Sequence, residues 1–175
     1  MILRHNTMNT LKNIFAVAVI VIGLAAATFA QTSLPSLNGG TVDVQAQKGK
    51  VVILAVGAKW LRLSEKQAQF TTALAKKYGG KNVAIYFIAT DSTNPKSKNQ
   101  ATDEEIREWA NKNNLNAVVL RDPDGAVLLG KFSIDQLPAF VILDKNGAMS
   151  GEAFTGIDPN FDITVPISKK VDSLL

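Results

Sequence analysis

Few side chains in this sequence could carry out covalent chemistry. There is no cysteine, which excludes disulfides, thiolate nucleophiles, iron–sulfur clusters and cysteine-ligated zinc. His5 is the only histidine, and it lies in an N-terminal segment that we expect to be absent from the mature protein, so a serine–histidine–aspartate triad and a histidine metal site are also excluded. Ser64 has a hydroxyl group but no histidine to act as its base, and we expect it to cap a helix.

The acidic residues occur where they would stabilise a helix or a turn. Four acids cap and solvate a predicted helix, whose positive end favours the carboxylates of its first turn: Asp103, Glu104, Glu105 and Glu108. Four others occupy predicted turns: Asp91, Asp122, Asp124 and Asp144. Neither a calcium loop with its terminal glutamate nor a glycine-rich phosphate loop is present. We therefore expect no cofactor and no metal.

The strands that would position a site are short and apolar. Val42 and Val44 alternate with polar neighbours, as in a half-buried strand. Continuous apolar runs predict buried strands at 51–56, 83–90, 117–120 and 139–144. Asn146-Gly147 predicts a tight hairpin that joins the last of these to a returning strand at 148–154.

Helical spacing predicts the remaining elements. Residues 64–78 form one helix, which Gly79-Gly80 ends, and residues 102–114 form another, which begins with a capping box at Thr102 and Glu105. Residues 126–132 predict a short helix, and residues 163–175 a terminal one. Strands that alternate with helices, followed by a hairpin, indicate an α/β fold with a central mixed sheet and helices on both faces.

The first 30 residues resemble a targeting segment. Arg4 and Lys12 precede the apolar run 14–30, and small residues precede Gln31. This pattern is typical of a cleaved signal peptide, although an uncleaved membrane anchor is the alternative. We expect residues 1–30 to be the leader and 31–175 the domain, in a protein that is exported to a periplasmic or extracellular location. Contact with a membrane is expected only if the leader stays attached.

The charge does not indicate nucleic-acid binding. The chain has 19 basic and 15 acidic residues, a formal net charge of +4. Removal of residues 1–30 takes away two basic residues and no acid, which leaves about +2. No basic run with interleaved aromatic residues occurs, so we expect no nucleic-acid partner.

Two segments of this sequence resemble a known family. KGKVVILAVGAKW (48–60) is similar to the first core strand of TlpA-like, exported thioredoxin-fold thiol-disulfide oxidoreductases. LRDPDGAVLLGKFSIDQLPAFVILDKNGAM (120–149) resembles their second signature, which includes a cis-proline at the position of Pro138. The likeness covers about residues 34–158. It implies a thioredoxin-like fold with a cis-proline loop at Pro138.

The catalytic segment departs from the family pattern. Trp60 matches the tryptophan that precedes the family's Cys-x-x-Cys dithiol, but Leu61 and Ser64 stand where its cysteines would be. Ala55 replaces a buried polar residue of the preceding strand. Thiol exchange needs one thiolate to attack and a second thiol to resolve the mixed disulfide. The sequence therefore predicts a degenerate member without redox activity.

The former active site could still bind a partner. In the family, the residue before the proline offers its backbone to a peptide, and that residue is Leu137 here. The alternative is that Pro138 only shapes the entrance to its strand. We expect an exported protein or peptide to bind a groove made of six residues: Trp60, Leu61, Arg62, Leu63, Leu137 and Pro138. The alternatives are a non-catalytic accessory of a thiol-disulfide oxidoreductase system and a structural module anchored in the envelope.

Overall fold

The computed structural model describes residues 32–175, and they form one compact unit. The predicted leader at residues 1–30 lies outside the described residues. None of the helices within 32–175 has the length and apolar character needed to cross a bilayer.

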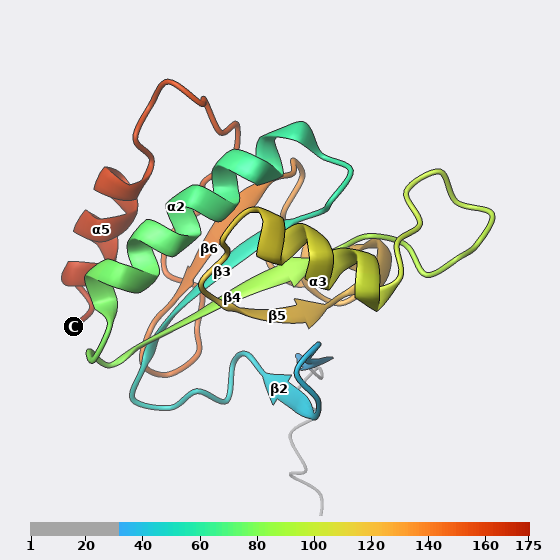
Figure 1. The fold of residues 1–175 in the computed structure, drawn as a ribbon. Helices are drawn as coiled ribbons and strands as arrows, with labels where there is room; N and C mark the ends of the chain where they lie inside the picture. Colours follow the sequence, from blue (N-terminus) through green and yellow to red (C-terminus); the bar gives the residue numbers. More distant parts are fainter. Residues whose placement is uncertain (1–31) are drawn as a thin grey trace, which may run out of the picture. The chain divides into compact units, whose positions relative to one another are not determined.

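A four-stranded mixed sheet is the centre of the unit (Figure 1). The strands lie in the order β5 (Val118–Arg121), β4 (Val83–Ala89), β3 (Val51–Gly57) and β6 (Ala139–Leu143). Neighbours among β3, β4 and β5 are parallel, and β6 is antiparallel to β3. The prediction of a mixed sheet is confirmed.

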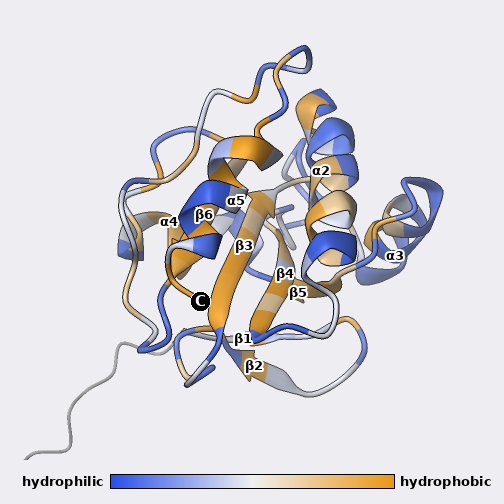
Figure 2. Ribbon diagram, turned by 90° about the vertical axis from the view of Figure 1, so that its left-hand side faces the viewer, coloured by the Kyte–Doolittle hydropathy of each residue, from blue (hydrophilic) through white to orange (hydrophobic). Residues whose placement is uncertain are grey.

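Strand β3 is buried along its whole length, as its apolar run predicts (Figure 2). Its side chains alternate between two cores. Ile53 and Ala55 point into the core formed with α2 (Arg62–Tyr78), α3 (Asp103–Lys112) and α5 (Thr164–Asp172). Val52 and Leu54 point to the opposite face, where Leu128 of the short helix α4 (Leu128–Lys131) packs. Helices therefore cover both faces, as the sequence indicates.

Local signals explain how two of the helices begin and end. The hydroxyl of Thr102 accepts the Glu105 N–H at 3.2 Å, and the Glu105 carboxylate accepts the Thr102 N–H at 2.8 Å, so the predicted capping box of α3 is confirmed. Helix α2 ends at Gly79-Gly80, and Gly80 has a φ of +76°, a conformation that favours glycine. A 3₁₀ turn, η1 (Pro123–Gly125), occupies the predicted turn after β5.

One expectation about strands is wrong, and one strand was not predicted. The returning strand at 148–154 is absent as a regular strand: Met149 and Phe154 form only isolated bridges with β6. Gly151 lies between these bridges with a φ of +84°, which interrupts extended pairing. A strand that the pattern did not predict, β1 (Ser33–Pro35), pairs antiparallel with β2 (Thr41–Asp43).

Candidate functional site

The candidate site begins at the loop that joins β3 to α2. Helix α2 starts at Arg62, and Leu61 is its N-cap without a side-chain hydrogen bond. The prediction that Ser64 caps this helix is therefore wrong. Ser64 lies inside the first turn, is fully buried, and its hydroxyl accepts the Ala58 N–H at 3.2 Å. This hydrogen bond joins the β3–α2 loop to the first turn of α2.

The predicted groove residues differ in exposure. Trp60 is 49% exposed, which is unusual for a large aromatic side chain. Arg62 is exposed, and three leucines, Leu61, Leu63 and Leu137, are half-buried. Pro138 is buried, and the Leu137–Pro138 peptide bond is cis, as the sequence predicts.

The two parts of the predicted groove, the start of α2 and the residues before β6, pack differently. Leu137 packs against the core on the α4 face of the sheet. Among the described residues, Trp60, Leu61 and Leu63 belong to neither core cluster. The apolar side chains at the start of α2 therefore lie outside both cores, with Trp60 exposed and Leu61 and Leu63 half-buried.

Gln67 connects the start of α2 to the strand that follows Pro138. Its side-chain nitrogen donates to the Ala139 carbonyl at 2.7 Å and to the Val56 carbonyl at 3.2 Å. Its Oε1 is buried and, within the described residues, has no hydrogen-bond partner. Val56 and Ala139 are paired across β3 and β6, so one amide holds helix, strand and proline loop together.

Gly57 allows this close approach. A Cβ atom at Gly57 would lie 2.3 Å from Gln67 Oε1 and 2.7 Å from Ser64 Oγ, distances too short for real contacts. Helix α2 can pack against the end of β3 in this way because the strand ends in glycine.

A charged network supports the other side of the loop. The Lys59 N–H donates to both carboxylate oxygens of Asp91 at 3.0 Å, and Lys59 Nζ lies 3.2 Å from Glu105. Arg121, also buried, donates to the Asp91 carbonyl at 3.1 Å. Burial raises the pKa of the Asp91 carboxyl, while the Lys59 N–H and the charges of Arg121 and Lys59 act in the opposite direction. The loop that carries Trp60 is thus tied to α3.

The role of Gln67 was not predicted from the sequence, and Asp91 was predicted only to occupy a turn. One signal was present for each: Gln67 follows Ser64 by three residues on the same helix face, and Asp91 comes directly after a buried strand. Neither signal distinguishes a buried hydrogen-bonding residue from an exposed one without the partner strands.

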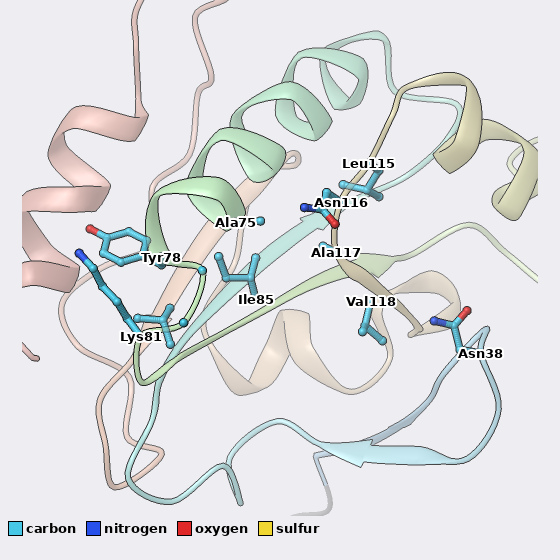
Figure 3. Close-up of a pocket in the computed structure, with 12 residues that line it drawn as sticks. Asn38, Ala75, Tyr78, Lys81, Ile85, Leu115, Asn116, Ala117 and Val118 are labelled. Atoms are coloured by element: carbon cyan, nitrogen blue, oxygen red, sulfur yellow. The ribbon is translucent and has the colours of Figure 1, made fainter.

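A separate cavity of about 480 Å³ lies away from these residues, between the C-terminal end of α2 and strands β4 and β5 (Figure 3). Ala75, Ile85 and Leu115 line it with apolar surface, and Asn38 and Asn116 add amides. None of the predicted groove residues lines it. Within residues 32–175, no cluster of three or more aspartate, glutamate or histidine side chains could hold a metal ion.

The fold and the site together define a thioredoxin-like redoxin domain without the dithiol of such enzymes. The model of the AhpC/TSA family matches residues 22–150, and the chain belongs to this family. It is a degenerate member, because it contains no cysteine. Comparison with curated proteins finds no match.

Solved structures support the same fold. A putative thiol:disulfide interchange protein DsbE from Chlorobium tepidum has a TM-score of 0.68 at 17% identity, over 82% of this chain and 92% of that one. A pneumococcal exposed lipoprotein thioredoxin from Streptococcus pneumoniae has a TM-score of 0.65 at 23% identity, over 82% and 99%. A secreted Mycobacterium tuberculosis disulfide oxidoreductase, homologous to E. coli DsbE, has a TM-score of 0.63 at 21% identity, over 83% and 97%.

Proposed function

We propose that this protein is an exported, redox-inactive thioredoxin-like domain that binds an extended segment of another polypeptide at the former active site. The exposure of Trp60 is the observation that carries the proposal. Its loop is held by Ser64 and Asp91, so the indole is presented on a rigid support. Tryptophan in such a position is typical of an interaction hot spot.

The backbone of Leu137 supports an extended partner. Within the described residues, neither its N–H nor its carbonyl takes part in a hydrogen bond. An extended peptide could pair with these groups as a strand pairs with a sheet edge, while Trp60 and Leu63 contact its side chains. Arg62, exposed at the same helix start, would favour an acidic residue in the partner.

Export is supported by the sequence and by two structural neighbours. The run at 14–30 has the pattern of a leader. One neighbour is described as secreted and another as an exposed lipoprotein. N-terminal sequencing of the exported protein tests this part: a start near Gln31 would support a cleaved leader, and an intact N-terminus would favour an anchored module.

The absence of cysteine separates this protein from its enzymatic relatives. Without a thiol the chain has no group that can attack a disulfide, so it should not reduce insulin. An accessory role remains the alternative, in which the domain holds a substrate for the cysteines of another protein. That role predicts faster turnover by an added oxidoreductase when this chain is present.

Selection of extended peptides from a displayed random library tests the groove. Selected peptides should quench or shift the fluorescence of Trp60, since Trp109 is buried against Phe87. Trp60→Ala and Leu137→Asp should weaken binding at least about tenfold, as expected for hot-spot residues. Phe161→Ala is the matched control, because Phe161 is 55% exposed but lies outside the groove. Equal binding by all three variants would contradict the proposal that the groove is the binding site.

A further inference from the structure

Lysines gather at the end of the domain where β3 and β4 begin. Four segments of the chain contribute them: 46–51, 76–82, 144–147 and 168–175. Together these segments carry eight lysines and no arginine: Lys48, Lys50, Lys76, Lys77, Lys81, Lys145, Lys169 and Lys170. All are exposed except Lys145 and Lys170, which are half-buried. We call this surface the lysine end.

Backbone and side-chain contacts bring these segments together. The Gly49 N–H donates to the Lys145 carbonyl at 2.9 Å, and the Val51 N–H donates to the Asn82 carbonyl at 3.0 Å. The Tyr78 hydroxyl lies 2.8 Å from a carboxylate oxygen of Asp172. The ends of α2 and α5 lie side by side next to the C-terminus (Figure 1).

The positive charge at the lysine end is only partly balanced by acidic groups nearby. Its segments contain two acids, Asp144 and Asp172. Asp144 accepts backbone N–H groups of its own turn, and Asp172 pairs with Lys77 at 3.4 Å. The dipoles of α2 and α5 account for the lysines in their last turns. They do not account for three lysines in loops, Lys48, Lys50 and Lys81, whereas the fourth, Lys145, donates to the main-chain oxygen of Leu175.

The chemistry of this end fits a broad anionic surface. Lysine is a hydrated point charge on a flexible stem, whereas arginine is the residue suited to a fixed, bidentate phosphate site. The exposed Leu175 adds apolar surface beside Lys145. Basic side chains around a small apolar group are typical of surfaces that attach to anionic lipids.

The path of the chain favours a bilayer over other anions. Thr32, the first described residue, accepts the Val44 N–H at 3.2 Å. Gln45, which follows Val44 in the chain, donates through its side-chain nitrogen to the Gly147 carbonyl at 2.8 Å. Gly147 belongs to the lysine end. The described chain therefore begins beside a segment that is hydrogen-bonded to the lysine end, and the sequence before it contains the apolar run 14–30. We propose that the lysine end docks on the anionic phospholipid headgroups of a membrane.

Docking in this way would orient the candidate site. Strand β3 runs from Val51 at the lysine end to Gly57 below Trp60. Its seven residues span roughly 20 Å at about 3.3 Å per residue. The surface that we propose for polypeptide binding would thus face away from the bilayer.

Lysine acylation, read by mass spectrometry, tests the proposal on the full chain. The chain is mixed with vesicles of phosphatidylcholine alone or of phosphatidylcholine with phosphatidylglycerol. Acylation of Lys48, Lys76 and Lys81 should slow several-fold only with phosphatidylglycerol, while Lys96 and Lys131, exposed elsewhere, should react unchanged. The protection should disappear at high salt, because screening weakens exposed charges. The rate is measured for each lysine separately. It therefore reports on the lysine end even if the apolar run 14–30 binds to both kinds of vesicle.

A matched pair of triple variants separates position from net charge. Lys48→Gln/Lys50→Gln/Lys76→Gln should abolish the protection of Lys77 and Lys81, because each lysine contributes about fivefold to affinity and three contribute about 100-fold. The control Lys96→Gln/Lys98→Gln/Lys131→Gln loses the same charge and should keep the protection. Equal protection of all lysines, or an equal effect of both triple variants, would overturn the proposal. Protection by soluble polyphosphate but not by vesicles would also overturn it, in favour of an anionic polymer.

Discussion

Replacement of Gln67 by glutamate tests the buried amide that joins α2 to the proline loop. The side chain is fully buried and faces the carbonyls of Val56 and Ala139. A carboxylate there would meet two carbonyl oxygens and no cation, so burial would hold its pKa far above the ordinary value. At pH 7 the unfolded variant ionises this glutamate, whereas the folded variant keeps it protonated. This difference should lower the free energy of unfolding by about 3–4 kcal/mol.

The sign of the pH dependence follows from proton binding. The folded Gln67→Glu variant binds a proton that its unfolded chain releases at lower pH, so the variant loses stability as the pH rises from about 4 towards neutrality. Below that range both states are protonated and the penalty is absent. The neutral acid can still donate one hydrogen bond to the Ala139 carbonyl.

Gln67→Leu is the uncharged control. It removes two hydrogen bonds, each worth about 1 kcal/mol, but also the unpartnered Oε1, whose burial costs about 1–3 kcal/mol. These terms nearly cancel, so the free energy of unfolding should change by about 1 kcal/mol or less. Urea unfolding of the three proteins across pH measures both effects. A glutamate variant whose loss does not depend on pH, or a leucine variant that loses as much, would refute the reasoning.

The remaining predictions concern the network, the cap and the lost dithiol. Burial raises the pKa of Asp91, so the contribution of this carboxyl to native stability should fall as pH rises above about 4; thermal unfolding of the native protein and of Asp91→Asn across pH should differ by this contribution. Thr102→Ala should lower the free energy of unfolding by about 1 kcal/mol in urea, through loss of the capping box; a loss near zero would contradict that geometry. Leu61→Cys/Ser64→Cys should form an intramolecular disulfide, because the two residues occupy the Cys-x-x-Cys spacing at a helix start; thiol titration that finds two free thiols after oxidation would contradict the correspondence with the family.

The four strands of the central sheet and the helices were predictable because their signals are local. The run 51–57 is apolar at nearly every position, which specifies a strand covered on both faces. Thr102 and Glu105 satisfy each other within one helical turn, so the start of α3 needed no tertiary information.

The site was less predictable because its supports come from distant parts of the chain. Ser64 has the side chain of a helix cap, yet its hydroxyl is used by Ala58, and the helix starts two residues earlier. Gln67 bonds a carbonyl 72 residues away, and Asp91 holds a backbone amide 32 residues away. No periodicity encodes such pairs.

The missing side chain of Gly57 has a consequence for how this surface could change. A methyl group at that position would clash with the side chains of Gln67 and Ser64, and the Ser64 hydroxyl holds the loop that leads to Trp60. The shape of the surface around Trp60 thus depends on buried residues, because α2 packs closely against the end of β3. New preferences for a partner could arise there through replacement of interior residues, while every outward-facing side chain stayed the same.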